Sequence, residues 1–181
     1  AYCFQEFDNV LVAFSGGKDS GVLLNLCYNY ADEHGLLDKL TMYHLDYEAQ
    51  YQMTTEYVTR TFLEQFPGIR KMWYCVPIKA QSACALGEPY WTPWDAAKKK
   101  LWVRAMPENP YVVHEGNLDV PFRHGMVDYE FQDKLSRHFA KKRGTTAVMV
   151  GLRADESLNR YAAVARGKKR RSYEGRKWIT Q

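Results

Sequence analysis

Several features that define other protein classes are missing from this 181-residue chain. No apolar run approaches the roughly 20 residues that a membrane-spanning helix needs, so we expect no membrane partner. The first nine residues lack the basic-then-apolar pattern of a secretion signal. The four cysteines form no CxxC pair and no zinc-finger spacing with histidine. Their scarcity excludes a disulfide scaffold and favours reduced thiols in the cytoplasm.

Metal-binding spacing is also missing, because the five histidines include no H-x-x-x-H pair. The sequence therefore predicts no metal site built by the protein alone. Charge is present but unevenly placed. Residues 166–177 hold seven basic side chains and one acidic one. The net charge of this segment is therefore larger than the net charge of +4 of the whole chain. This basic segment has two interpretations of equal weight: an arm that contacts nucleotide phosphates or nucleic acid, or a solvated loop without a specific ligand.

Hydrophobic periodicity predicts strands that alternate with helices. We expect strands at residues 9–14, 39–45, 70–76 and 145–150. We expect helices at residues 21–34, 51–66 and 126–143. This order predicts an α/β fold, a Rossmann-like parallel sheet with helices on both faces. On the first helix, the apolar side is expected to hold Val22, Leu23, Leu26, Cys27 and Tyr30.

One stretch does not fit this alternation. Residues 80–121 are rich in proline and tryptophan, and we expect them to form an insertion or lid over the sheet edge. The remaining segments indicate one nucleotide-binding domain over residues 1–181. Since the chain begins without methionine, we expect it to be a piece of a longer protein.

The strongest functional motif is the SGGKDS loop between the first strand and the first helix. It comprises Ser15, Gly16, Gly17, Lys18, Asp19 and Ser20. The glycines let an anion approach the backbone, and amides at a helix start attract negative charge. The serine hydroxyls can donate to phosphate oxygens, Lys18 supplies a positive charge, and Asp19 or Ser20 can cap the helix. The spacing is neither that of a Walker A loop nor G-x-G-x-x-G, and a plain strand-to-helix turn is the alternative.

Two later segments also follow predicted strands and could reach the same edge of the sheet. Asp46 ends the second strand and could bind a ribose hydroxyl, orient a metal-bound water or cap the next turn. Gly151 opens a segment in which Arg153 and Arg160 lie two helical turns apart. Two guanidinium groups on one face could hold phosphate or sulfate oxygens, and surface salt bridges with Asp155 or Glu156 are the alternative.

These motifs together resemble a known superfamily. SGGKDS is similar to the S-G-G-x-D-S pyrophosphate-binding (PP-) loop of the adenine-nucleotide α-hydrolases, which include N-type ATP pyrophosphatases and phosphoadenosine phosphosulfate (PAPS) reductases. The strand ending at Asp46 and the G-x-R-x-x-x-S-x-x-R pattern of residues 151–160 resemble the PAPS-reductase branch. The resemblance spans about residues 9–165. The sequence at 44–51 and the insertion resemble most an uncharacterised subgroup that includes the Ibr-type prophage-gene coactivators.

The resemblance implies an adenine nucleotide as ligand, namely ATP, PAPS or a related adenylyl compound. The nucleotide and its phosphates would bind at residues 15–20, Asp46, Gly151, Arg153 and Arg160, with Lys18 and Asp19 as candidate catalytic residues and Mg²⁺ required if the substrate is ATP. The E-C-G-x-H cysteine and the cluster cysteines of reductases are missing, so no iron–sulfur cluster is expected in this chain.

Two alternative functions stay open from the sequence. The first is a nucleotide-sensing transcriptional coactivator or DNA-associated protein without turnover, which the basic segment 166–177 and the coactivator resemblance motivate. The second is an N-type ATP pyrophosphatase that forms an adenylated intermediate. Both alternatives keep the PP-loop as the nucleotide site, so they differ from a PAPS-reductase-like enzyme only in the chemistry that follows binding.

Overall fold

The computed structural model describes residues 1–82, 87–153, 158, 171–173 and 176–178. Its centre is a five-stranded sheet in the order β6-β3-β2-β1-β7, and every neighbouring pair is parallel. The strands are β1 (Asn9–Ala13), β2 (Leu40–Leu45), β3 (Arg70–Cys75), β6 (Val112–His114) and β7 (Thr146–Val150). The α/β Rossmann-like fold class expected from the sequence is therefore confirmed.

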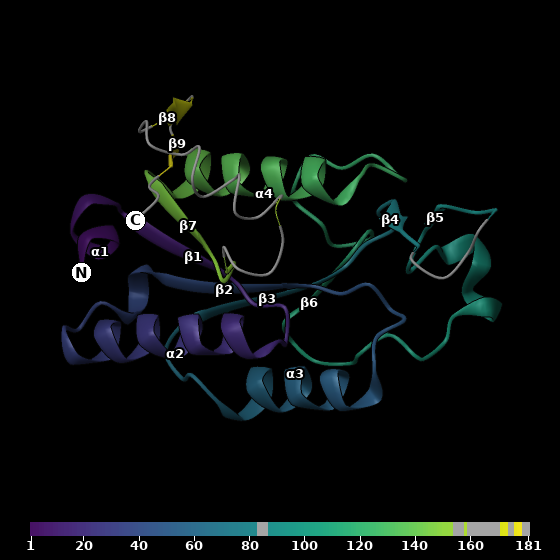
Figure 1. The fold of residues 1–181 in the computed structure, drawn as a ribbon, viewed down its shortest axis with the longest axis horizontal. Coiled ribbons are helices and arrows are strands. Elements are labelled where there is room, and N and C mark those ends of the chain that lie inside the picture. The colour runs from purple at the N-terminus through teal and green to yellow at the C-terminus, as the bar shows by residue number, and fades with distance from the viewer. Residues whose placement is uncertain (83–86, 154–157, 159–170, 174–175, 179–181) are drawn as a thin grey trace.

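Helices cover both faces of this sheet (Figure 1). The helices are α1 (Tyr2–Glu6), α2 (Lys18–Glu33), α3 (Gln52–Glu64) and α4 (Asp128–Arg143), with short 3₁₀ turns η1 (Leu37–Lys39) and η2 (Ala96–Leu101). Successive strand residues point to opposite faces. Val10 and Val12 accordingly pack in the core under α2 and α3, whereas Leu11 packs in the core under α4. Within the described residues no helix is long and apolar enough to cross a membrane.

The expected insertion is shorter than the sequence suggests. Residues Val112–His114, which were expected to belong to it, form β6 and pair with β3 at the edge of the sheet. A three-residue strand among prolines leaves almost no periodic signal, and its partner β3 lies far away in sequence. The segment before it contains β4 (Ala80–Gln81) paired with β5 (Tyr90–Trp91), then η2. Figure 1 shows these elements beyond the carboxyl ends of the strands.

Helix α2 buries a side that overlaps only in part with the expected one, since Cys27 is buried and Leu23 and Tyr30 pack against the core. Its buried residues are Ser20, Gly21, Leu24, Cys27 and Ala31. Val22 and Leu26, which were expected in the core, are 59% and 64% exposed. At the start of the helix, the Ser20 hydroxyl donates to the Gly17 carbonyl. Apart from Leu24 the buried residues are small, and periodicity alone could not distinguish two overlapping apolar stripes.

Candidate functional site

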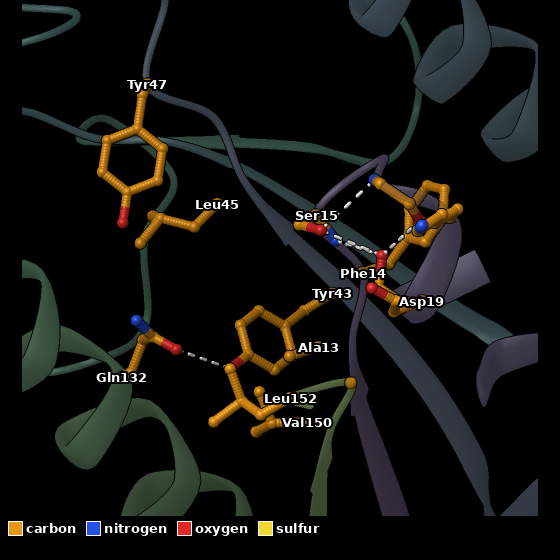
Figure 2. Close-up of a pocket in the computed structure, with 14 residues that line it drawn as sticks. Ala13, Phe14, Ser15, Asp19, Tyr43, Leu45, Tyr47, Gln132, Val150 and Leu152 are labelled. Carbon is orange, nitrogen blue, oxygen red and sulfur yellow. Dashed lines mark hydrogen bonds between the residues drawn. The ribbon is translucent and has the colours of Figure 1, made fainter. Parts of the chain in front are cut away.

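A cavity of about 350 Å³ opens at the carboxyl end of the parallel strands. It lies at the point where the strand order of the sheet reverses direction, since β1 is flanked by β2 on one side and by β7 on the other. Open parallel sheets carry their ligands at this position. Figure 2 shows the loop residues Ser15 and Asp19 on one side of the cavity, and Leu45, Tyr47 and Gln132 on the other. The cavity therefore has a polar end and a more apolar, aromatic end.

Hydrogen bonds inside the SGGKDS loop fix its shape. Ser20 Oγ donates to the Gly17 carbonyl at 2.9 Å and accepts from the Ser15 amide at 3.2 Å. The two serine Oγ atoms are 2.9 Å apart. Because the Ser20 proton is already engaged, Ser15 is the donor between them. Both hydroxyls, which were expected to meet phosphate, are thus bonded within the loop in this structure.

Helix α2 begins at Lys18, inside the SGGKDS motif, with Gly17 at the N-cap. No side chain of the described residues caps it, so the cap expected from Asp19 or Ser20 is not formed. Amides in the first turn of a helix have no partner within the helix and carry the positive end of its dipole. Lys18 and Asp19 both line the cavity beside these amides. This end of the cavity is consequently suited to an anion.

Two glycines allow close approaches that other residues would block. Gly16 has φ +82°, and a Cβ on it would lie 2.7 Å from Val58 Cγ2 and 3.0 Å from Thr54 Cγ2 of α3. A Cβ on Gly151 would lie 2.9 Å from the Ser20 backbone nitrogen. Helix α3 therefore packs behind the loop, and the end of β7 packs against the start of α2. The sequence singled out both glycines, although the contacts that require them are tertiary.

The arginine pair predicted from the sequence is placed only in part. Gly151 and Leu152 line the cavity, and Arg153 follows them with an exposed side chain. Arg160 lies outside the described residues. Of the basic segment 166–177, the structure describes the backbone of β8 (Arg171–Tyr173) and β9 (Arg176–Trp178), which form an antiparallel pair.

Asp46 points away from the cavity into a buried ion pair. Its side chain is fully buried, and Arg104 Nη2 donates to both of its carboxylate oxygens at 2.6 Å. Trp73 Nε1 donates to the same carboxylate at 2.7 Å. Arg104 belongs to the segment after η2, inside the stretch expected to form an insertion or lid, and was not itself singled out from the sequence. The geometry shows that Asp46 holds that segment onto the end of β2.

Glu48 completes this attachment, two residues further on. Its carboxylate accepts from the backbone amides of Trp94 and Val103 at 2.8 and 2.9 Å, and its carbonyl accepts from Arg104 Nε. Both Glu48 and Trp94 have positive φ values, +64° and +54°. Such conformations cost energy in residues other than glycine and persist where the surroundings impose them. We call the contacts of Asp46 and Glu48 with residues 94–104 the buckle.

The buckle determines which residues of the β2–α3 connection face the cavity. Because side chains alternate along an extended backbone, Leu45 and Tyr47 line the cavity while Asp46 and Glu48 face the buckle. Tyr47 donates a 2.9 Å hydrogen bond to Asp128 at the start of α4, and burial raises the pKa of its phenol so that it stays protonated. Tyr47 was not singled out from the sequence, although the alternation around Asp46 could have indicated it.

The described cysteines lie away from the cavity. Cys27 and Cys75 are buried, and burial raises the pKa of Cys27 to about 11 and that of Cys75 as well. Neither these nor Cys3 lines the cavity, and Cys84 is outside the described residues. Among the residues that the structure describes, no three His, Cys, Asp or Glu side chains are grouped as metal ligands would be.

His44 is a buried titratable group, from which we expect a dependence of stability on pH. Its ring is completely buried, and Nδ1 lies 2.8 Å from the Phe14 carbonyl, to which it donates. Burial lowers its pKa below the ordinary 6.5, against the opposing pull of Asp46. The unfolded chain therefore binds the proton more readily. We expect the free energy of unfolding to fall as pH drops below about 6.5, by up to about 1.4 kcal/mol per pH unit.

Urea denaturation between pH 5 and pH 8 measures this dependence. In His44→Asn, the amide can still donate to the Phe14 carbonyl but does not titrate, so the slope below pH 6.5 should be smaller than in the wild type. Equal slopes in both proteins would show that other groups cause the acid sensitivity.

Comparisons with known proteins cover nearly the whole chain. The family model described as "Phosphoadenosine phosphosulfate reductase domain" matches residues 9–173. A curated relative, "Uncharacterized protein YbdN" of Escherichia coli (strain K12), is 32% identical over 181 residues, which are 99% of this chain and 43% of that protein. The chain thus spans less than half the length of this relative. No solved structure matches this chain significantly.

Proposed function

Since this chain belongs to the phosphoadenosine phosphosulfate reductase domain family, we propose that it binds an adenine nucleotide in the cavity at the carboxyl end of the sheet. The observation that carries the proposal is the uncapped start of α2 behind a glycine loop, which forms one end of that cavity. Phosphate or sulfate groups would accept from the first-turn amides and pair with Lys18. The base would occupy the opposite end, between Leu45 and Leu152.

Between ATP and PAPS, the described residues favour ATP. Reduction of PAPS requires a thiolate that attacks sulfur, and no described cysteine lines the cavity. The two buried thiols also have raised pKa values, which oppose formation of a thiolate. With ATP, an acceptor oxygen would attack the α-phosphorus and pyrophosphate would leave, as in an N-type ATP pyrophosphatase. The protein would contribute mainly positioning and charge stabilisation.

ATP would enter with Mg²⁺, which neutralises phosphate charge. This ion commonly takes one or two carboxylates together with phosphate oxygens and water. Asp19 is the carboxylate that lines the phosphate end of the cavity, so the residues present fit such an arrangement. Lys18 and Asp19 would then hold the anionic tail and its counter-ion on the first turn of α2.

A thermal-shift panel of ATP, AMP, adenosine phosphosulfate and PAPS, with and without Mg²⁺, tests this proposal. A ligand present at about 100 times its Kd stabilises the folded state by about 2.7 kcal/mol, so its melting temperature rises. We expect Asp19→Asn to lose the Mg²⁺-dependent part of the ATP shift. Asp32→Asn, at the exposed other end of α2, is the matched control and should keep it.

Release of pyrophosphate and AMP from ATP distinguishes an enzyme from a sensor. Turnover that is lost in Asp19→Asn and kept in Asp32→Asn supports the pyrophosphatase-type reaction. Nucleotide binding without turnover, together with salt-sensitive DNA binding that needs residues 166–177, would instead identify a nucleotide-sensing regulator. No shift with any of the four compounds would contradict the nucleotide site itself.

A further inference from the structure

Tyr43, Tyr47 and Gln132 line the wall of the cavity opposite the SGGKDS loop, and each of them belongs to a hydrogen-bonded pair. Tyr43 Oη and Gln132 Oε1 are 3.0 Å apart, and Tyr47 Oη and Asp128 Oδ2 are 2.9 Å apart. The tyrosines are four residues apart at the end of β2, and their partners are four residues apart on one face of α4. Each phenol donates, because an amide oxygen and a carboxylate oxygen can only accept. The two pairs therefore connect β2 to α4 beside the cavity.

The two pairs leave different groups for a ligand. Asp128 also accepts from the Tyr129 amide through its second oxygen, so its carboxylate is well occupied. Gln132 accepts from Tyr43, and its amide nitrogen has no hydrogen-bond partner among the described residues. Figure 2 shows the oxygen of this carboxamide directed to Tyr43 and the nitrogen directed away from it. Gln132 lines the cavity, so its two N–H groups are a donor available there.

We propose that Gln132 is a specificity-determining residue that reads the base of the bound nucleotide. This inference rests on the proposed function, which places the phosphates at the loop and hence the base at the opposite wall. A carboxamide presents a donor next to an acceptor. Adenine presents the complementary acceptor ring nitrogen next to a donor amino group, and one such bidentate pair discriminates strongly against the wrong base.

Tyr43 sets the orientation of this carboxamide. In the structure the phenol donates to Oε1, and a half-turn of the amide would require the phenol to give up this donation and to accept from an N–H group instead. In the orientation that the structure shows, the N–H groups are free of Tyr43 and Oε1 keeps a second lone pair for a ligand donor. Hypoxanthine has a protonated N1 and a carbonyl at C6, so it reverses both partners and does not match the carboxamide in this orientation.

The experiment compares the dissociation constants of ATP and ITP, which differ only in these two groups. The wild type should bind ATP at least about tenfold more tightly than ITP. In Gln132→Glu the carboxylate can still accept from Tyr43, but it replaces the N–H groups with an acceptor. The preference for ATP should fall by at least about tenfold. The added negative charge weakens both nucleotides alike and cancels in the ratio of the two constants.

Two further variants keep this test decisive. Gln5→Glu adds the same charge at an exposed position on α1 and should leave the ratio unchanged. Tyr43→Phe retains the ring and the folded wall but frees the carboxamide to rotate, so discrimination should fall partway. A ratio in Gln132→Glu equal to that of the wild type would overturn the role of Gln132. Failure of the wild type to bind either nucleotide would instead contradict the proposed function.

Discussion

Replacing Arg104 with methionine is expected to lower the free energy of unfolding by about 3 kcal/mol. The substitution leaves the fully buried Asp46 carboxylate without the guanidinium that donates to both of its oxygens. Trp73 remains as a neutral donor but cannot balance the charge. Arg104 also packs over the Trp94 ring, with its guanidinium carbon 4.8 Å from the ring centre, so packing is lost as well. The midpoint of urea denaturation measures the effect.

The control for this prediction is an arginine in an exposed ion pair. Arg123 lies 3.5 Å from Glu130, and the arginine side chain is well exposed while the glutamate is partly exposed. Arg123→Met should change stability by no more than about 0.5 kcal/mol. The double variant Arg104→Met/Asp46→Asn removes both buried charges and should recover part of the loss. A wild-type midpoint in Arg104→Met would mean that Asp46 is not held by this pair in solution.

Replacing Gly16 with alanine should abolish nucleotide binding and destabilise the fold by at least about 2 kcal/mol. The φ value of +82° alone costs about 1–2 kcal/mol in a residue with a Cβ. The added methyl group would also lie 2.7 Å from Val58 Cγ2, and Val58 is fully buried, so relief requires α3 or the loop to move. Movement of the loop displaces the amides at the start of α2. Calorimetric titration with ATP, below the melting temperature of the variant, measures the loss of binding.

Gly35 separates the cost of backbone conformation from the cost of the clash. It lies beyond the other end of α2 with φ +65°, and a Cβ there would meet nothing within 4 Å. Gly35→Ala should therefore cost only about 1–2 kcal/mol and leave the affinity for ATP unchanged. Wild-type affinity in Gly16→Ala would show that the loop does not need its close packing against α3 to bind the nucleotide.

The buckle and the packing of Gly16 against α3 stabilise two different parts of the same cavity. The buckle holds the end of β2, which carries Leu45 and Tyr47 into the cavity wall. The connection that begins there continues into α3, against which Gly16 packs. Residues 94–104 thus contribute to the candidate site by holding the β2–α3 connection in place, without lining the cavity themselves.

The sequence by itself determined the parallel fold and the position of the loop. Long segments of strong periodicity indicated the four long strands and the three long helices, because burial on one or two faces leaves a repeating apolar pattern. SGGKDS located the end of the cavity at which we propose that phosphate binds, because a glycine-rich turn that opens a helix is typical of a phosphate-binding loop. Strand β6 and helix α1 were missed, since three and five residues are too short to show a period.

Only the tertiary structure decided how the remaining side chains are used. In the sequence Asp46 resembles a ligand-binding residue, yet it pairs with Arg104, 58 residues away. Gln132 is one polar residue among many on α4 until the fold brings it to Tyr43. Periodicity records which face of an element is buried, and it carries no information about which distant polar group will meet a given side chain. These side-chain contacts depend on the packing of β2 against α4 and on the path of residues 94–104. No local sequence pattern specifies either of them.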